Sequence, residues 1–191
     1  MKGTYDYVIN PTIACANRLY LKKDLDLLRE LQNKMVHIDI MDGQYVPNLC
    51  FDFDTIKVIK ENYPFILDVH LMVQNPQDYL IKLGQLGIDY VSVHLDATHT
   101  PIRLLKMIKE NNMKAGIVLN PYQRVQELEY VLEYVDYVVI MGVEPGFSGQ
   151  TFIEATYQKI EKLSQIRKEK SLKQESRGQP KKKSMANKPP N

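Results

Sequence analysis

The 191-residue chain has no tryptophan, only two cysteines, and no apolar run approaching the roughly 18 residues that a membrane-spanning helix needs. Cys15 and Cys50 are too few for a disulfide framework or a four-thiolate metal site, and they favour a reducing compartment, the cytoplasm. The first residues, MKGTYDYVIN, lack the apolar core of a secretory signal. With 44% hydrophobic and 25% charged residues, the composition is typical of a soluble globular protein without a membrane partner.

Positive charge is concentrated near the C-terminus. From Arg167 onward, nine Lys and Arg side chains oppose only two Glu. Residues 171–191 contain too few apolar side chains to offset the entropy of ordering them, which predicts a folded domain over 1–170 and a disordered Lys-rich tail over 171–191. Such a tail can bind nucleic-acid phosphates, but it lacks aromatic residues to stack on bases, so a solvated tail is the preferred interpretation.

Short apolar runs alternate with helical patterns along the rest of the chain. This alternation predicts six βα units with parallel strands. A doubly wound sheet would use six strands, whereas a (β/α)8 barrel needs eight and typically about 200 to 250 residues. Leu128 and Leu132 predict a helix before the last run. The six runs begin at Tyr7, Met35, Phe65, Tyr90, Met113 and Tyr137.

The most specific polar group lies in the run that begins at Met35. His37 and Asp39 alternate with Ile38 and Ile40, and alternate side chains of a strand share a face. The isoleucines therefore suit packing against helices, and His37 and Asp39 point into the sheet interior or a barrel lumen. Because an unpaired charge is costly there, the two form either a hydrogen-bonded core pair or part of a metal site.

The next run repeats this arrangement, because Asp68 and His70 share one face of their strand. Active residues of parallel α/β folds gather at the carboxyl ends of the strands. Two neighbouring strands with inward His and Asp therefore strengthen the metal interpretation. A third run places Ser92 and His94 on one face. His94 is a metal ligand, a substrate contact or a core histidine, and we favour the core role.

Two loops add candidate ligand contacts. Residues 144–150, EPGFSGQ, follow the last apolar run, and Gly146 and Gly149 suit a loop that exposes backbone N–H groups to an anion. The alternative is an ordinary tight turn, and the lack of Lys excludes a Walker P-loop. Near the N-terminus, Thr12 follows Asn10 and Pro11, so its hydroxyl is either a ligand contact or a turn residue.

Together these motifs resemble the ribulose-phosphate 3-epimerase family, including its allulose-6-phosphate 3-epimerase relatives. The similarity runs from about residue 8 to about residue 163. Three long motifs in the same order make the match specific. They are HIDIMDGQYVPNL at 37–49, LDVHLMVQNPQDY at 67–79 and MGVEPGFSGQTF at 141–152, with support from GIVLNP at 116–121.

The resemblance implies a TIM (β/α)8 barrel that interconverts D-ribulose 5-phosphate and D-xylulose 5-phosphate. It implies a divalent cation on His37, Asp39 and His70, and zinc, iron, manganese and cobalt all accept such mixed ligands. Asp39 also matches one of the two acid–base carboxylates of the family. The implied partner is a small sugar phosphate. Its expected contacts are Thr12, His70, Gly146, Phe147, Ser148 and Gly149.

The implied chemistry accounts for these residue types. The C3 proton is alpha to the C2 carbonyl, and its removal gives an enediolate that a divalent cation stabilises. One carboxylate removes the proton from one face, and a second returns a proton to the other face. Met41, Met72 and Met141 are each at a strand end, and we expect them to form a dry wall that strengthens the electrostatics.

The seventh and eighth strands of the family have no counterpart in this sequence. The seventh strand would bring the second catalytic Asp, and no Asp follows Asp136. We therefore interpret residues 1–170 as an incomplete barrel of a truncated or frameshifted epimerase. It would have impaired activity and open strand edges that favour a homo-oligomer. The alternatives are an allulose-6-phosphate 3-epimerase and a non-catalytic remnant that binds phosphosugar or metal.

Overall fold

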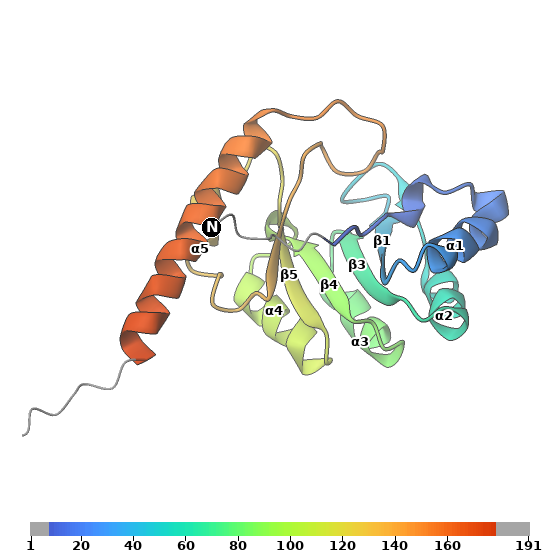
Figure 1. Cartoon of the computed structure of the whole chain (residues 1–191), viewed down its shortest axis with the longest axis horizontal. Helices are drawn as coiled ribbons and strands as arrows, with labels where there is room; N and C mark the ends of the chain where they lie inside the picture. Colours follow the sequence, from blue (N-terminus) through green and yellow to red (C-terminus); the bar gives the residue numbers. More distant parts are fainter. Residues whose placement is uncertain (1–7, 179–191) are drawn as a thin grey trace, which may run out of the picture.

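A single six-stranded sheet organises the computed structural model, which describes residues 8–178 (Figure 1). The strand order is β2-β1-β3-β4-β5-β6, and every neighbouring pair is parallel except β1 and β2. Within the described part of the chain, no strand pairs with the outer edge of β6. The strands are β1 (Met35–Asp42), β2 (Leu49–Cys50), β3 (Ile66–Met72), β4 (Tyr90–His94), β5 (Lys114–Leu119) and β6 (Tyr137–Ile140).

Helices connect and flank these strands. Figure 1 shows α1 to α4 around the sheet and α5 as a long helix at its side. No described helix is both long and apolar enough to cross a membrane. The α-helices are α1 (Leu21–Glu30), α2 (Phe53–Asn62), α3 (Gln77–Gln85), α4 (Pro101–Glu110) and α5 (Ala155–Gly178). Short 3-10 helices are η1 (Ile13–Cys15), η2 (Arg18–Tyr20), η3 (Leu95–Ala97) and η4 (Val125–Leu128).

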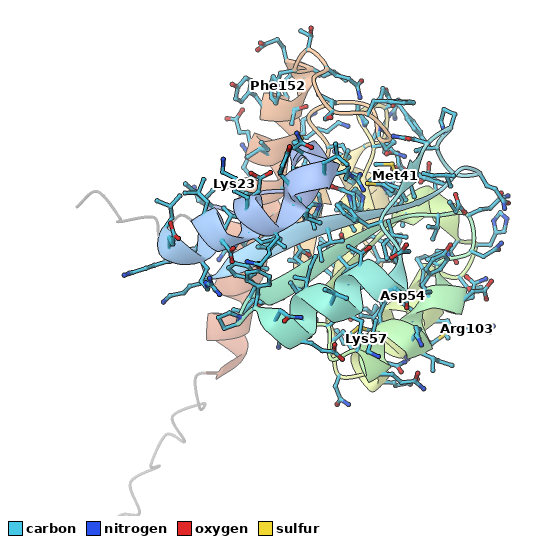
Figure 2. All side chains as sticks on the ribbon, turned by 90° about the vertical axis from the view of Figure 1, so that its right-hand side faces the viewer. Lys23, Met41, Asp54, Lys57, Arg103 and Phe152 are labelled. Atoms are coloured by element: carbon cyan, nitrogen blue, oxygen red, sulfur yellow. The ribbon has the colours of Figure 1, made fainter. Side chains whose placement is uncertain are left out.

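The apolar core lies between the sheet and its helices. Ile38 and Ile40 of β1 belong to it, as predicted, together with buried helix residues such as Leu80 and Leu105. Charged residues lie on the outer surface of α1 and α2. Figure 2 shows Lys23 on α1 and Asp54 and Lys57 on α2, and all three are exposed. One face of the sheet is therefore committed to packing, which leaves the opposite face for the polar residues.

The α/β class and the mainly parallel sheet are confirmed, and five of the six predicted strands are present as β1, β3, β4, β5 and β6. The strand predicted at Tyr7 is wrong for the described residues. Only one parallel bridge, between Thr12 and His37, remains of it. Pro11 accepts a hydrogen bond from the His37 N–H but has no N–H to donate, which limits the pairing. The short β2 was not predicted.

Two further predictions are corrected. The helix expected at Leu128 and Leu132 is only the 3-10 helix η4 followed by turns, although Leu128 is fully buried. Aromatic and β-branched neighbours such as Tyr130 and Val131 lower helix propensity there. In the tail predicted as disordered, residues 171–178 are helical, because the segment is rich in good helix formers until Gly178. Residues 179–191 lie outside the described part.

Candidate metal centre

The candidate site is built on the in-register pairing of β1 with β3. His37 is the partner of Asp68 and Asp39 is the partner of His70 in this parallel ladder. Because paired residues of neighbouring strands point to the same face, all four side chains lie on the face away from the buried isoleucines. The alternation of the sequence predicted this face, and the register adds which residues are neighbours.

Three of these side chains converge. The donor atoms of His37, Asp39 and His70 all lie within 4.8 Å of one another. Asp39 Oδ1 lies 3.3 Å from His37 Nε2 and 3.3 Å from His70 Nδ1. Asp39 and His70 are buried, and His37 is half-buried. Mixed imidazole and carboxylate donors at this spacing fit a divalent cation such as zinc, iron, manganese or cobalt.

The charges in the set are strongly coupled. Burial favours the neutral form of His37, but hydrogen bonds and attraction from Asp39 and Asp68 outweigh it and raise the pKa of His37 to about 10. Burial likewise opposes the ionised form of Asp39, yet its hydrogen bonds with His37 and His70 hold the pKa of that carboxyl well below its usual range. The carboxylate form of Asp39, which a cation needs, is therefore favoured.

His94 contacts His70 rather than joining the set. Its Nε2 lies 2.8 Å from His70 Nε2, and the two rings stack with their centroids 4.8 Å apart. Burial and the charge of His70 lower the pKa of His94 to about 2, so His94 is neutral. The Tyr45 ring lies on its other side at 4.7 Å. The favoured core interpretation of His94 missed this contact, which depends on the pairing of β3 with β4.

The sequence analysis also did not predict the hydrogen-bonded group around Asp68. Asp68 is 6% exposed, and its carboxylate accepts hydrogen bonds from three side chains. His37 Nδ1 lies 2.7 Å from Oδ2, Asn10 Nδ2 lies 2.8 Å from Oδ2, and the Tyr137 hydroxyl lies 3.0 Å from Oδ1. The sequence placed Asp68 on the correct face, but it contained no local signal for the contribution of Asn10 or Tyr137.

Thr12 lies at the edge of the same site. Its hydroxyl donates a hydrogen bond of 2.5 Å to Asp39 Oδ2, the carboxylate oxygen that does not contact the histidines. Met41 and Met72 are buried together with Val46 and Cys50, beside the donor set in the ladder. Met141 is half-buried and is not part of that cluster, so the expected methionine wall contains two of the three residues.

The predicted substrate loop follows β6 at the carboxyl edge of the sheet. Gly146 is buried and has a φ of +110°, and Asn48 Nδ2 donates to its carbonyl oxygen at 2.8 Å. A Cβ at Gly146 would lie 3.0 Å from the Cβ of Val46, so the close approach needs glycine. Phe147, Ser148 and Gly149 are exposed. In the described residues, Gly146 contacts Val46 and Asn48 of the loop after β1, and the predicted substrate loop makes no hydrogen bond with His37, Asp39 or His70.

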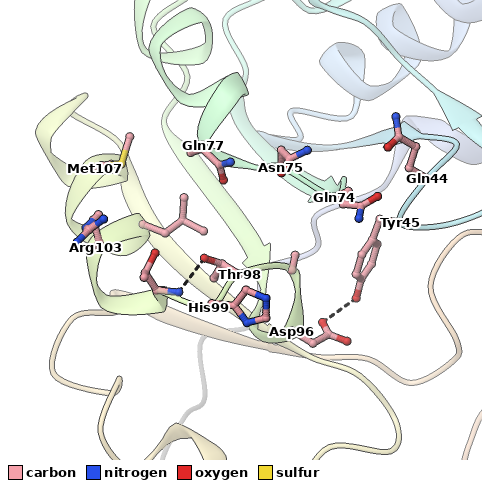
Figure 3. A pocket seen from close by; sticks show the side chains of 13 residues that line it. Gln44, Tyr45, Gln74, Asn75, Gln77, Asp96, Thr98, His99, Arg103 and Met107 are labelled. Carbon is pink, nitrogen blue, oxygen red and sulfur yellow. Dashed lines mark hydrogen bonds between the residues drawn. The ribbon is translucent and has the colours of Figure 1, made fainter.

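A cavity of about 680 Å³ has Tyr45 in its wall and is not lined by His37, Asp39 or His70. Figure 3 shows the Tyr45 hydroxyl pointing to Asp96 in its wall, with 2.9 Å between Tyr45 Oη and Asp96 Oδ1. The Tyr45 ring also contacts His94, so it stands between the cavity and the histidines. The polar residues lining the cavity include Gln44, Gln74, Asn75, Thr98, His99 and Arg103.

Comparison with known sequences identifies the family to which the chain is similar. The model of the "Ribulose-phosphate 3 epimerase family" matches residues 8–178. A ribulose-phosphate 3-epimerase of Aquifex aeolicus is 38% identical over 133 residues, which is 70% of this chain and 60% of that protein. A ribulose-phosphate 3-epimerase of Bacillus subtilis is 35% identical over 165 residues, which is 86% of this chain and 76% of that protein. The chain thus spans less than two thirds of the Aquifex relative.

Solved structures agree in fold. The phospho-2-dehydro-3-deoxyheptonate aldolase of Thermotoga maritima superposes with a TM-score of 0.57, over 83% of this chain and 48% of that chain. Because the sequences are 15% identical, this likeness concerns the fold alone.

Proposed function

Because the chain belongs to the ribulose-phosphate 3-epimerase family, we propose that it binds a ketose phosphate and abstracts its C3 proton. The proposed substrate is D-ribulose 5-phosphate, and the proposed base is Asp39. A divalent cation would be held by His37, Asp39 and His70. One observation carries the proposal: these three donors converge within 4.8 Å on one face of β1 and β3.

In the proposed reaction, the cation stabilises negative charge, Asp39 removes the proton, and Thr12 orients the reacting groups. When bound, a divalent cation supplies positive charge beside the carbonyl oxygen that becomes negative as the proton leaves. Asp39 faces the two histidines through Oδ1 and takes the C3 proton through Oδ2. Thr12 orients that carboxylate or a substrate hydroxyl, and its contact with Asp39 Oδ2 supports this role.

The loop from Gly146 to Gly149 is the proposed phosphate contact. Both glycines have a positive φ, which lets the backbone turn its N–H groups toward an anion. Ser148 and Gly149 are exposed and therefore available to a ligand. The contact of Asn48 with Gly146 ties this loop to the loop that follows β1, the strand that carries Asp39, which supports a shared substrate site.

Inversion at C3 needs a second proton donor on the opposite face of the substrate. In the described part of the chain, Asp39 and Asp68 are the buried carboxylates, and Asp68 already accepts from His37, Asn10 and Tyr137. We therefore expect the 191-residue polypeptide on its own to exchange the C3 proton with solvent. It should form little D-xylulose 5-phosphate.

Deuterium exchange tests this proposal. The polypeptide is incubated in deuterated water with D-ribulose 5-phosphate and zinc, manganese, cobalt or ferrous ion, and C3 is followed by NMR. We expect metal-dependent incorporation that falls about 100-fold or more in Asp39→Asn, the typical effect of losing a general base. Asp89→Asn is the matched control, because Asp89 binds Lys60 and the Leu67 N–H at the other end of the sheet.

Each other outcome has a defined meaning. Turnover to D-xylulose 5-phosphate at about 1 per second or faster would contradict the expected impairment. Binding without exchange would identify a non-catalytic phosphosugar-binding remnant. Faster exchange with D-allulose 6-phosphate would identify the six-carbon sugar as the substrate.

A further inference from the structure

Asp68 lies on the far side of His37 from the converging donors. Its carboxylate is buried, and it is not one of the three residues whose donor atoms converge. His37 Nδ1 lies 2.7 Å from Asp68 Oδ2, whereas His37 Nε2 lies 3.3 Å from Asp39 Oδ1. Nδ1 of the His37 ring therefore faces Asp68, and Nε2 faces the donor set.

Two side chains from distant parts of the chain donate hydrogen bonds to the Asp68 carboxylate and hold it in place. The Tyr137 hydroxyl binds Oδ1 at 3.0 Å, and Asn10 Nδ2 binds Oδ2 at 2.8 Å. Tyr137 is on β6, and β4 and β5 lie between it and Asp68 on β3. With both oxygens engaged, the carboxylate cannot rotate freely relative to the His37 ring.

The sheet leaves space for the Tyr137 ring at one position. Gly116 of β5 is the register partner of Tyr137. A Cβ at Gly116 would lie 2.4 Å from Tyr137 Cζ, so the ring passes directly over the glycine. Any larger residue at 116 would occupy this space, which ties the reach of Tyr137 to the absence of a side chain there.

We propose that Asp68 is a positioning residue for the metal centre, held in place by Tyr137 and Asn10. A carboxylate accepts and cannot donate, so it requires the proton of His37 on Nδ1. In the neutral imidazole that a cation binds, the lone pair then lies on Nε2, the nitrogen beside Asp39, and the ring is oriented toward the cation. The inference rests on the proposed metal site and adds the residues that prepare it.

Metal affinity tests the proposal without relying on turnover. Cobalt(II) is titrated into the metal-free full chain, by calorimetry and by its visible absorption. Asp68→Asn should raise the dissociation constant about 10- to 100-fold, as the loss of such a partner does in other metal sites. Tyr137→Phe keeps the ring over Gly116 and should raise it about 2- to 10-fold, the effect of one hydrogen bond. Asp89→Asn should change it less than about twofold, because the Asp89 carboxylate binds Lys60 and the Leu67 N–H and contacts none of the three donors, His37, Asp39 and His70.

A spectroscopic signature separates positioning from general destabilisation. In the zinc-loaded chain, nitrogen NMR should show His37 protonated at Nδ1 and ligated through Nε2. Asp68→Asn should weaken or redistribute this signal, because an amide can also donate to the ring. Unchanged cobalt affinity together with an unchanged His37 signal in Asp68→Asn would overturn the proposal.

The remaining outcomes are equally decisive. If Asp68→Asn does not fold, Tyr137→Phe decides: wild-type affinity and an unchanged His37 signal in that variant overturn the proposal. Failure of the unaltered chain to bind cobalt or zinc overturns the metal site and this inference together. Metal binding with the expected variant pattern, but no deuterium exchange, leaves the inference standing and refutes only the proposed activity.

Discussion

Adding one methyl group at Gly116 should destabilise the chain through Tyr137. The new Cβ would lie 2.4, 2.6 and 2.8 Å from Tyr137 Cζ, Cε2 and Cε1, all of them inside contact distance. The ring is not free to swing away, because its hydroxyl is bound to Asp68 at 3.0 Å. Gly116 itself does not have a positive φ, so the backbone accepts alanine and the clash is the only obstacle.

The sizes of the two opposing effects set the expected result. Relieving the overlap requires a shift of about 1 Å, which breaks or strains the hydrogen bond to Asp68; overpacking or losing such a bond costs about 1–3 kcal/mol. Replacing glycine with alanine also reduces the freedom of the unfolded chain, which stabilises by about 0.4–1 kcal/mol. Gly116→Ala should therefore lower the free energy of unfolding by about 1–2 kcal/mol in the unaltered chain.

The same change should have the opposite sign when the ring is absent. Tyr137→Val keeps a side chain suited to a strand but removes the atoms that clash. In that background, Gly116→Ala should stabilise the chain by about 0.4–1 kcal/mol. Urea unfolding followed by circular dichroism gives all four free energies of this cycle. An equal loss of stability in both backgrounds would refute the proposed contact between residues 116 and 137.

Two other contacts give simpler predictions. Asp52→Ala should lower the free energy of unfolding by about 1 kcal/mol in urea, because Asp52 caps α2 by accepting the Thr55 N–H at 2.8 Å; an unchanged unfolding midpoint would contradict this. For Asp42, burial favours the neutral acid, but N–H groups of Gln74 and Tyr45 outweigh it and lower the pKa of Asp42 below 3.8. Asp42→Asn should therefore be less stable than the unaltered chain at neutral pH, and the gap should close as the pH falls through that lowered pKa. A gap that stays constant with pH would show that the charge of Asp42 is irrelevant.

Local pattern was sufficient to place the candidate residues on one face, whereas the choice of His37, Asp39 and His70 as metal ligands came from the resemblance to the epimerase family. The alternation of His37 and Asp39 with two isoleucines defines a polar and an apolar face without knowledge of the fold. The same period in β3 places His70 on the matching face, and parallel pairing then brings the three donors together. Period and strand order thus predict a convergence that depends on neighbouring strands alone.

The same reasoning could not find contacts that cross several strands. Tyr137 reaches Asp68 past β4 and β5, and this depends on the length of its ring and on the missing side chain at Gly116. In the sequence, Tyr137 is one more aromatic residue at the start of an apolar run, and Gly116 is one more glycine. Only the register of β5 with β6 shows that the two residues are paired.

The loss of the expected first strand has a similar origin. Apolar composition around Tyr7 and Val8 predicts a strand, but pairing also needs backbone donors at the right places. Pro11 removes one of them, and the described pairing is limited to Thr12 with His37. The segment nevertheless contributes Asn10 and Thr12 to the site, so its side chains act where its backbone forms no regular strand.

His37 and His70 each contact a buried side chain outside the donor set, and these contacts separate the requirements for metal binding from those for substrate binding. Each imidazole uses one nitrogen toward Asp39 and the other toward a buried partner, which is Asp68 for His37 and His94 for His70. Both partners lie on strands, and strands hold side chains more firmly than loops do. The phosphate contact, in contrast, is proposed for the loop after β6. Metal binding should therefore not require the loop after β6, and it should persist in variants of that loop that no longer bind the sugar phosphate.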